Sequence, residues 1–241
     1  MMEPEPASAD CPRCLKPHAL CVCSELSQVQ NRTSVLILQH PQEQDRTLGT
    51  ARLATLQLEN AVLKIGLSWP SLAAALGRPA DPKRWAVVYL GSAAPAELAP
   101  EREVLVLDRK GQPVPDQEAA LRGIEGIVLL DGTWSQAKTL WWRNPWVLKA
   151  KRIVLNPSRP SRYGLIRREP RRDSLSTLEA AGLALARIEG KPAIETALVA
   201  SFEQMLARAR SVALDADGGN DRRARKPPGQ RRRRVRAGRR P

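Results

Sequence analysis

Short apolar runs alternate along the chain with segments of helical spacing. Runs rich in Val, Ile and Leu predict buried strands, because strands that are covered on both faces are apolar throughout. These runs are residues 33–40, 61–66, 84–91, 103–108, 126–131 and 151–157. Apolar positions three and four apart predict helices over residues 46–60, 70–77, 135–144, 174–190 and 193–210. The alternation predicts an α/β fold with a mostly parallel sheet and helices on both faces.

Polar residues fall where several of these strands end. His40, Asp131 and Asn156 each stand at the carboxyl end of an apolar run. Ligands of open parallel sheets bind beyond the carboxyl ends of the strands. This edge of the sheet is therefore the expected ligand site.

The stretch GIVLLDGTWSQAKTLWW, residues 126–142, shows most clearly how an apolar strand gives way to polar residues at its carboxyl end. At a ligand crevice, the Asp131 carboxylate could accept a proton or orient a cation, and the Trp134 indole could face a base or a sulfonium. A purely structural interpretation is also open. Asp131 and Thr133 have the side chains of helix N-caps, Gly132 permits a sharp turn, and Trp134 suits a core.

The charge of the chain is concentrated at its C-terminus. The 241 residues suit one domain with small appendages and carry a formal charge of +14. Residues 222–241 hold eleven Lys or Arg and no acid, which leaves +3 for the rest. Such a tail cannot bury a core, so we expect it to be disordered, either attracted to polyanions in a salt-dependent way or simply solvated.

The sequence predicts neither a membrane span nor a secretory signal. No apolar run approaches the roughly 18 residues that a membrane span needs. The N-terminal MMEPEPASAD lacks the basic start and apolar segment of a secretory signal. The expectation is a cytoplasmic chain.

All four cysteines lie close to the N-terminus. Cys11, Cys14, Cys21 and Cys23 follow the spacing C-x2-C-x6-C-x-C. Four thiolates satisfy tetrahedral zinc and leave no open position for catalysis, so the pattern favours a structural zinc site. Disulfides and free thiols are the alternatives, and the reducing cytosol disfavours the first of them.

A basic loop precedes the first long C-terminal helix. Ser176 and Glu179 match the S-x-x-E capping box, which predicts a helix start there. A helix N-terminus also attracts an anion. The arginines crowded beside it suit phosphate or ligand contacts, or a solvated basic loop; they are Arg162, Arg167, Arg168, Arg171 and Arg172.

Three blocks in order, CPRCLKPHALCVC, LLDGTWSQAK and SRYGLIRREPRRDSLSTLEA, resemble the DTW-domain family of tRNA-uridine aminocarboxypropyltransferases. The resemblance covers about residues 10–210. It implies a SPOUT-like fold, a class that holds S-adenosylmethionine in a crevice of knotted C-terminal loops; whether this chain forms the knot is left open. It also implies transfer of the 3-amino-3-carboxypropyl group of S-adenosylmethionine to N3 of a tRNA uridine, with release of methylthioadenosine.

The resemblance also assigns roles to residues. The D-x-T-W signature falls on Asp131, Thr133 and Trp134, the expected catalytic residues, and Asp131 is the candidate proton acceptor. Residues at the last strand end and the helix start are expected to hold S-adenosylmethionine; they are Asn156, Pro157, Ser176, Thr177 and Glu179. Arg162, Arg167 and Arg168 are expected to contact tRNA. The family's cysteine pattern falls on all four cysteines.

These interpretations predict three parts and a tRNA partner. The parts are a zinc module over residues 1–29, a SPOUT-like catalytic domain over residues 30–215 and a disordered Arg-rich tail over residues 216–241. A monomer is favoured over the dimers common among SPOUT proteins. Three rival functions stay open: a SPOUT-like S-adenosylmethionine-dependent RNA methyltransferase, a non-catalytic zinc-containing RNA-binding protein, and a basic ribosomal protein.

Overall fold

A six-stranded sheet forms the centre of the molecule. The computed structural model describes residues 10–88, 101–108, 110–164 and 175–221, with side chains described as far as residue 212. The strands are β1 (Ser34–Gln39), β2 (Ala61–Ile65), β3 (Trp85–Val88), β4 (Val104–Leu107), β5 (Gly126–Asp131) and β6 (Lys151–Leu155), in the order β2-β1-β5-β3-β6-β4. All neighbouring pairs are parallel except β4 with β6. The prediction of a mostly parallel sheet is therefore confirmed.

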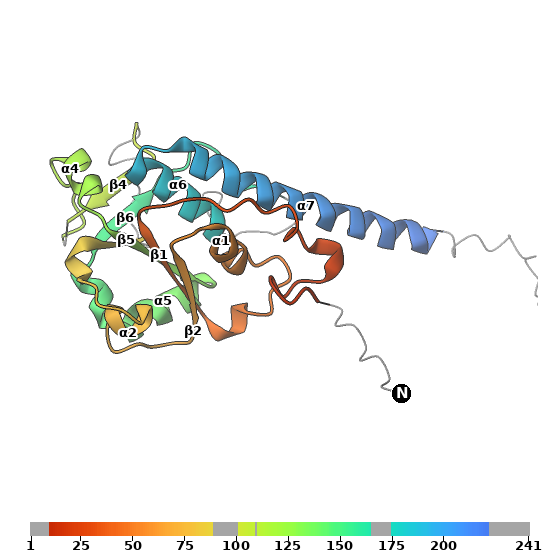
Figure 1. Cartoon of the computed structure of the whole chain (residues 1–241), viewed down its shortest axis with the longest axis horizontal. Helices are drawn as coiled ribbons and strands as arrows, with labels where there is room; N and C mark the ends of the chain where they lie inside the picture. Colours follow the sequence, from red (N-terminus) through yellow and green to blue (C-terminus); the bar gives the residue numbers. More distant parts are fainter. Residues whose placement is uncertain (1–9, 89–100, 109, 165–174, 222–241) are drawn as a thin grey trace, which may run out of the picture.

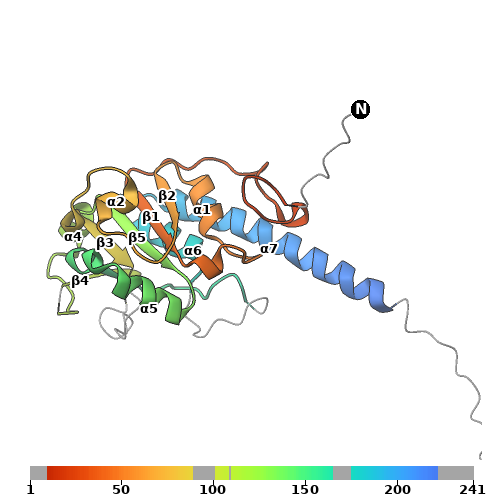
Figure 2. The same cartoon turned by 90° about the horizontal axis from the view of Figure 1, so that it is seen from below.

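Helices lie on both faces of this sheet, as predicted. They are α1 (Ala51–Gln57), α2 (Leu72–Leu76), α4 (Gln117–Arg122), α5 (Trp134–Arg143), α6 (Thr177–Glu189) and α7 (Pro192–Asp221), and the 3-10 turns are η1 (His18–Leu20), η2 (Pro41–Glu43), η3 (Pro82–Arg84) and η4 (Pro145–Lys149). Figures 1 and 2 show α6 and α7 on one side of the sheet and α2 and α5 on the other.

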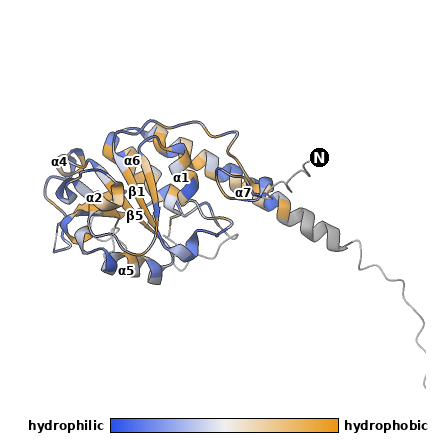
Figure 3. Ribbon diagram, turned by 60° about the horizontal axis from the view of Figure 1, so that its bottom comes forward, coloured by the Kyte–Doolittle hydropathy of each residue, from blue (hydrophilic) through white to orange (hydrophobic). Residues whose placement is uncertain are grey.

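Each central strand contributes to two hydrophobic cores. In β1, Val35 and Ile37 pack toward α1, α6 and α7, whereas Leu36 and Leu38 pack toward α2 and α5. All four side chains are buried, which explains why this strand reads as a continuous apolar run. Figure 3 shows the apolar colour of β1 and β5 at the centre of the molecule.

The two C-terminal helices complete the larger core. Nearly every residue of α6 from Leu178 to Ile188 is buried, because the helix lies between the sheet and α7. With 30 residues, α7 is about 45 Å long and projects beyond the body of the molecule (Figure 1). It continues to Asp221, past residue 216 where the tail was predicted to begin, and residues 222–241 lie outside the described part of the chain.

Some predicted elements differ from those in the structure. The helix predicted over residues 46–60 is shorter, because residues 47–50 form a loop that other segments bind. The short helix α4 was not predicted; Asp116 caps it by accepting a hydrogen bond from the Ala119 N–H at 2.9 Å. The SPOUT relationship, the knot and the division into three parts stay predictions. Within the described residues, no helix is both long and apolar enough to cross a membrane.

Candidate active site

Asp131 lies at the carboxyl edge of the sheet and is half-buried. The Gln39 side-chain amide at the end of β1 donates to Asp131 Oδ2 at 2.8 Å. The Thr177 hydroxyl at the start of α6 donates to Asp131 Oδ1. The backbone N–H of His40 donates to the Asp131 carbonyl at 2.9 Å. Two strands and one helix start thus converge on this carboxylate and fix its orientation.

The turn that follows Asp131 is a capped helix start. Thr133 Oγ1 accepts from the Gln136 N–H at 3.4 Å, and Gln136 Oε1 accepts from the Thr133 N–H at 2.6 Å. Gly132 is required because a Cβ there would lie 2.8 Å from the Gln136 Cβ. The N-cap interpretation of Thr133 is therefore confirmed, and its T-x-x-Q capping box was a signal that sequence analysis overlooked.

Trp134 is the first residue of α5 and is half-buried. The Lys138 ammonium lies over its ring, 5.5 Å from the centroid. A cation in this position interacts favourably with the negative face of the indole. One ring face is therefore already turned toward a charge.

The start of α6 has the predicted capping box. Ser176 Oγ accepts from the Glu179 N–H at 3.2 Å, and Glu179 Oε2 accepts from the Ser176 N–H at 2.9 Å. The same buried carboxylate also accepts from the Ser161 hydroxyl at 2.7 Å and the Arg162 N–H at 2.8 Å. Both Glu179 oxygens thus bind the chain itself, and they attach the basic loop to α6.

Residues 47–50 connect this edge with the cysteine segment. Lys16 Nζ donates to the carbonyls of Thr47 and Gly49, both at 2.7 Å. The Tyr163 hydroxyl donates to the Leu48 carbonyl at 2.7 Å, and Thr50 Oγ1 accepts from the Leu178 N–H at 3.3 Å. Sequence analysis missed Lys16, Tyr163 and Thr50, since no spacing signals contacts between residues so far apart in the chain.

Burial lowers the pKa of Lys16 to about 8, while the nearby Cys14 thiol and the Asp131 carboxylate act in the opposite direction. The Lys16 ammonium is therefore electrostatically coupled both to the cysteine cluster and to Asp131.

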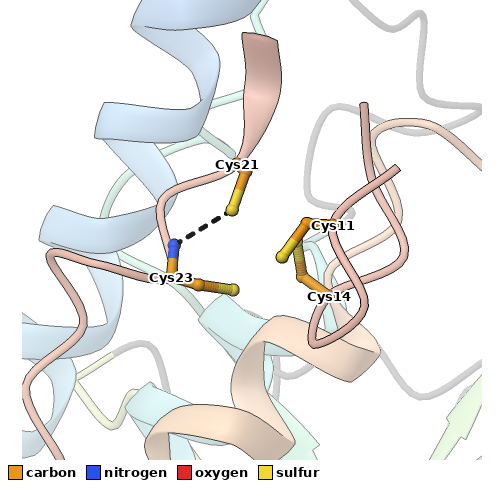
Figure 4. Close-up of side chains that lie close together, drawn as sticks. All are labelled: Cys11, Cys14, Cys21 and Cys23. Atoms are coloured by element: carbon orange, nitrogen blue, oxygen red, sulfur yellow. Dashed lines mark hydrogen bonds between the residues drawn. The ribbon is translucent and has the colours of Figure 1, made fainter. Parts of the chain in front are cut away.

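The four cysteines form one cluster, drawn in Figure 4. Their sulfur atoms come from two chain segments and all lie within 4.8 Å of one another. None forms a disulfide. Zn–S bonds of about 2.3 Å in a tetrahedron require sulfurs this close, so the set fits a zinc site with four cysteine ligands. The Cys23 N–H donates to the Cys21 sulfur at 3.4 Å, which suits a thiolate ligand.

The environment of the cluster favours the thiolate form at Cys11 and the protonated thiol at Cys14 and Cys23. Hydrogen bonds from the backbone of Cys14 and Arg13 lower the pKa of Cys11 to about 6. Burial instead raises the pKa values of Cys14 and Cys23. A bound cation would offset that penalty, because it stabilises the deprotonated form.

The other predicted residues are more scattered. Asn156 follows β6, where its N–H donates to the Glu103 carbonyl at 2.8 Å, and Pro157 comes next. Because β3 separates β5 from β6, the strand ends that carry Asp131 and Asn156 are about 10 Å apart. The Arg162 guanidinium binds Glu203 of α7 at 2.9 Å. Arg167, Arg168, Arg171 and Arg172 lie outside the described residues.

Comparisons with known proteins identify a family and relatives of this chain. A family profile described as "DTW domain" matches residues 8–210. Proteins called "tRNA-uridine aminocarboxypropyltransferase 2" are 29% identical over 211 residues in Macaca fascicularis, 30% over 201 in Mus musculus and 33% over 193 in Drosophila melanogaster. These matches cover 85%, 81% and 78% of this chain, and 64%, 62% and 70% of the relatives. No solved structure matches significantly.

Proposed function

This chain belongs to the DTW domain family, and from that premise we propose that it is a tRNA-uridine aminocarboxypropyltransferase. Its donor is S-adenosylmethionine and its acceptor is N3 of a uridine in tRNA. The observation that carries the proposal is the position of Asp131, oriented by Gln39 and Thr177 at the sheet edge where α/β proteins bind ligands.

Asp131 is the proposed proton acceptor. Uridine N3–H is a weak acid, and N3 becomes a good nucleophile when its proton leaves. N3 then attacks the carbon of the 3-amino-3-carboxypropyl group that is bonded to sulfur. The N–C bond forms as the C–S bond breaks, and the electron pair stays on sulfur as neutral methylthioadenosine. The proton passes through Asp131 to water. Gln39 and Thr177 hold the carboxylate in place for this step.

Positioning contributes most of the catalysis in this proposal, since all three carbons on a sulfonium are electrophilic. Trp134 either stacks on the uracil or walls the crevice. If it stacks, Trp134→Phe retains more activity than Trp134→Ala. Equal activity of the two variants would contradict stacking.

The donor is held between the last strand end and the start of α6 in this proposal. The candidates are Asn156, Pro157, Ser176, Thr177 and Glu179. The N–H groups of Leu178 and Glu179 already bind the chain, as do both Glu179 oxygens. Glu179 therefore supports the site chiefly by fixing the basic loop.

The tRNA lies against the basic loop in this proposal, where Arg162, Arg167 and Arg168 contact phosphates. Such contacts position RNA without reading its sequence. Zinc, held by Cys11, Cys14, Cys21 and Cys23, fixes the N-terminal segment that Lys16 connects to residues 47–50. A four-sulfur site supplies structure and no chemistry to the transfer.

Incubation with S-adenosylmethionine and unmodified tRNA, followed by nucleoside mass spectrometry, tests the proposal. The expected result is a uridine that has gained the 3-amino-3-carboxypropyl mass, with an equal amount of methylthioadenosine. A uridine that has gained a methyl group would indicate the methyltransferase instead. Unchanged nucleosides from a chain that binds tRNA would indicate a binding protein.

A further inference from the structure

The outer side of α5 carries an exposed aromatic side chain that the proposed reaction does not use. The Trp142 side chain is 75% exposed, the highest value among the large hydrophobic residues of the described part of the chain. An indole presents a large apolar area, so leaving it in water forgoes substantial stabilisation from burial. This exposure suggests a role in contacting another molecule.

Trp142 belongs to a stripe that begins at the proposed active site. Trp134, Lys138 and Trp142 follow one another at four-residue spacing and span an arc of about 80° around the helix, and the partly buried Trp141 lies about 20° outside that arc. Lys138 lies over the Trp134 ring, and Arg152 lies over the Trp141 ring at 5.8 Å. Aromatic rings therefore alternate with cations along this face, which we name the α5 stripe.

The chain segment that contains the α5 stripe carries only positive charges. From residue 132 to residue 164 the sequence has no Asp or Glu and seven Lys or Arg. Faces that combine stacking rings with cations are typical of single-stranded nucleic-acid sites, because each base offers a π-face and each phosphate a negative charge. Lys is depleted at protein–protein interfaces, so Lys138 within the stripe favours a nucleic-acid partner over a protein.

We propose that the α5 stripe binds the single-stranded RNA next to the target uridine, with a base stacked on Trp142 and a phosphate near Lys138. This proposal rests on the proposed function, which supplies tRNA as the occupant. N3 lies on the pairing edge of uridine, so the reacting nucleotide must be unpaired, and its neighbours need support.

The length of the α5 stripe determines how many nucleotides separate the target uridine from the base stacked on Trp142. Eight residues of helix separate Trp134 from Trp142, which is about 12 Å. A strand that advances about 3.4 Å per stacked nucleotide covers this distance in roughly three to four nucleotides, and an extended one in fewer. The stacked base is therefore two to four positions from the uridine.

Binding of unmodified tRNA without S-adenosylmethionine tests the proposal, by fluorescence anisotropy at one fixed salt concentration. The loss of one base stack corresponds to about 1–3 kcal/mol, so Trp142→Ala should weaken binding about 5- to 150-fold. Trp142→Phe should stay within about threefold of wild type, since a phenyl ring still stacks. The matched control is Leu148→Ala, because Leu148 is 44% exposed on η4, outside α5.

A second measurement locates the stacked base. Single-stranded oligonucleotides with a central uridine carry one abasic site at successive positions on either side. Wild type should lose affinity at a position two to four nucleotides from the uridine, and Trp142→Ala should show no further loss there. Lys138→Ala should reduce the slope of log affinity against log salt by about one.

Three results would overturn the proposal: wild-type affinity of Trp142→Ala, equal weakening by Leu148→Ala, or a change of oligomeric state in Trp142→Ala, which would make the α5 stripe a protein interface. Because binding is measured without the donor, the result is separate from the transfer reaction. A chain that binds tRNA through Trp142 but transfers nothing would refute the proposed function alone.

Discussion

Replacement of Asp131 by Asn separates the chemistry of the site from its stability. The side chains have nearly the same shape, but Asn carries no charge and cannot accept the N3 proton. Removal of a general base costs typically 10²- to 10⁴-fold in rate. We therefore expect transfer by Asp131→Asn to fall by about two to four orders of magnitude.

The cost in stability follows from the two hydrogen bonds that the carboxylate accepts. Bonds to a charged acceptor contribute about 1.5–3 kcal/mol and neutral ones about 1 kcal/mol. In the variant the Thr177 hydroxyl can still donate to the amide oxygen, but the new NH₂ group faces the buried Gln39 amide, which must turn over. The expected loss is about 1–3 kcal/mol, equivalent to a melting temperature roughly 2–10 °C lower.

Methylthioadenosine release at 25 °C measures the activity, and urea unfolding measures the stability. Gln39→Leu is the control, because it removes a hydrogen bond from the same carboxylate, keeps the charge and changes none of the residues proposed to hold the donor. It should lose comparable stability but much less activity than Asp131→Asn. Wild-type turnover by folded Asp131→Asn would refute the assignment of residue 131 as the proton acceptor, and equal losses of activity in the two variants would reduce that residue to a structural role.

Three further predictions concern the scaffold. The purified chain should contain one zinc per molecule, and Cys23→Ser should lose the metal and melt at a lower temperature; native thiols that all react freely with a thiol reagent would contradict the site. Burial raises the pKa of Glu103, but hydrogen bonds from Arg187 and Ser158 and the Arg187 charge together outweigh burial and hold that pKa below its ordinary value. These interactions therefore stabilise the fold above about pH 4.5, and this contribution is lost as pH falls through the lowered pKa. Urea unfolding should show Glu103→Gln less stable than wild type by under about 1 kcal/mol at pH 6, a difference that shrinks on acidification; a constant difference would contradict the coupling. Gly126→Ala should cost about 1–3 kcal/mol in urea unfolding, because its Cβ would lie 2.5 Å from the Trp85 ring, and an unchanged midpoint would mean that the ring moves freely.

The sheet was predictable because strands that are buried on both faces consist of continuous apolar residues. β1 and β5 are apolar at every central position, and the polar residue at the end of each marks the edge where the site was expected. The Ser176 capping box was also readable, since the cap and its partner are three residues apart.

The partners of the site residues were not predictable, because they come from distant segments. Gln39 and Thr177 bind Asp131 from 92 and 46 positions away. Lys16 is an ordinary basic residue by sequence, yet it is buried between the cysteine cluster and residues 47–50. Pattern reasoning identifies an element and its ends, whereas these contacts depend on how the elements pack.

The strand order has a consequence for synthesis of the protein on the ribosome. β5 lies between β1 and β3 although it is made after both. Until residues 126–131 have left the exit tunnel, β1 has one edge without its final partner, and α6 and α7 do not yet exist to cover the larger core. A nascent chain cannot fold in stages from its N-terminus, and its first half exposes the apolar surface and strand edges that chaperones protect.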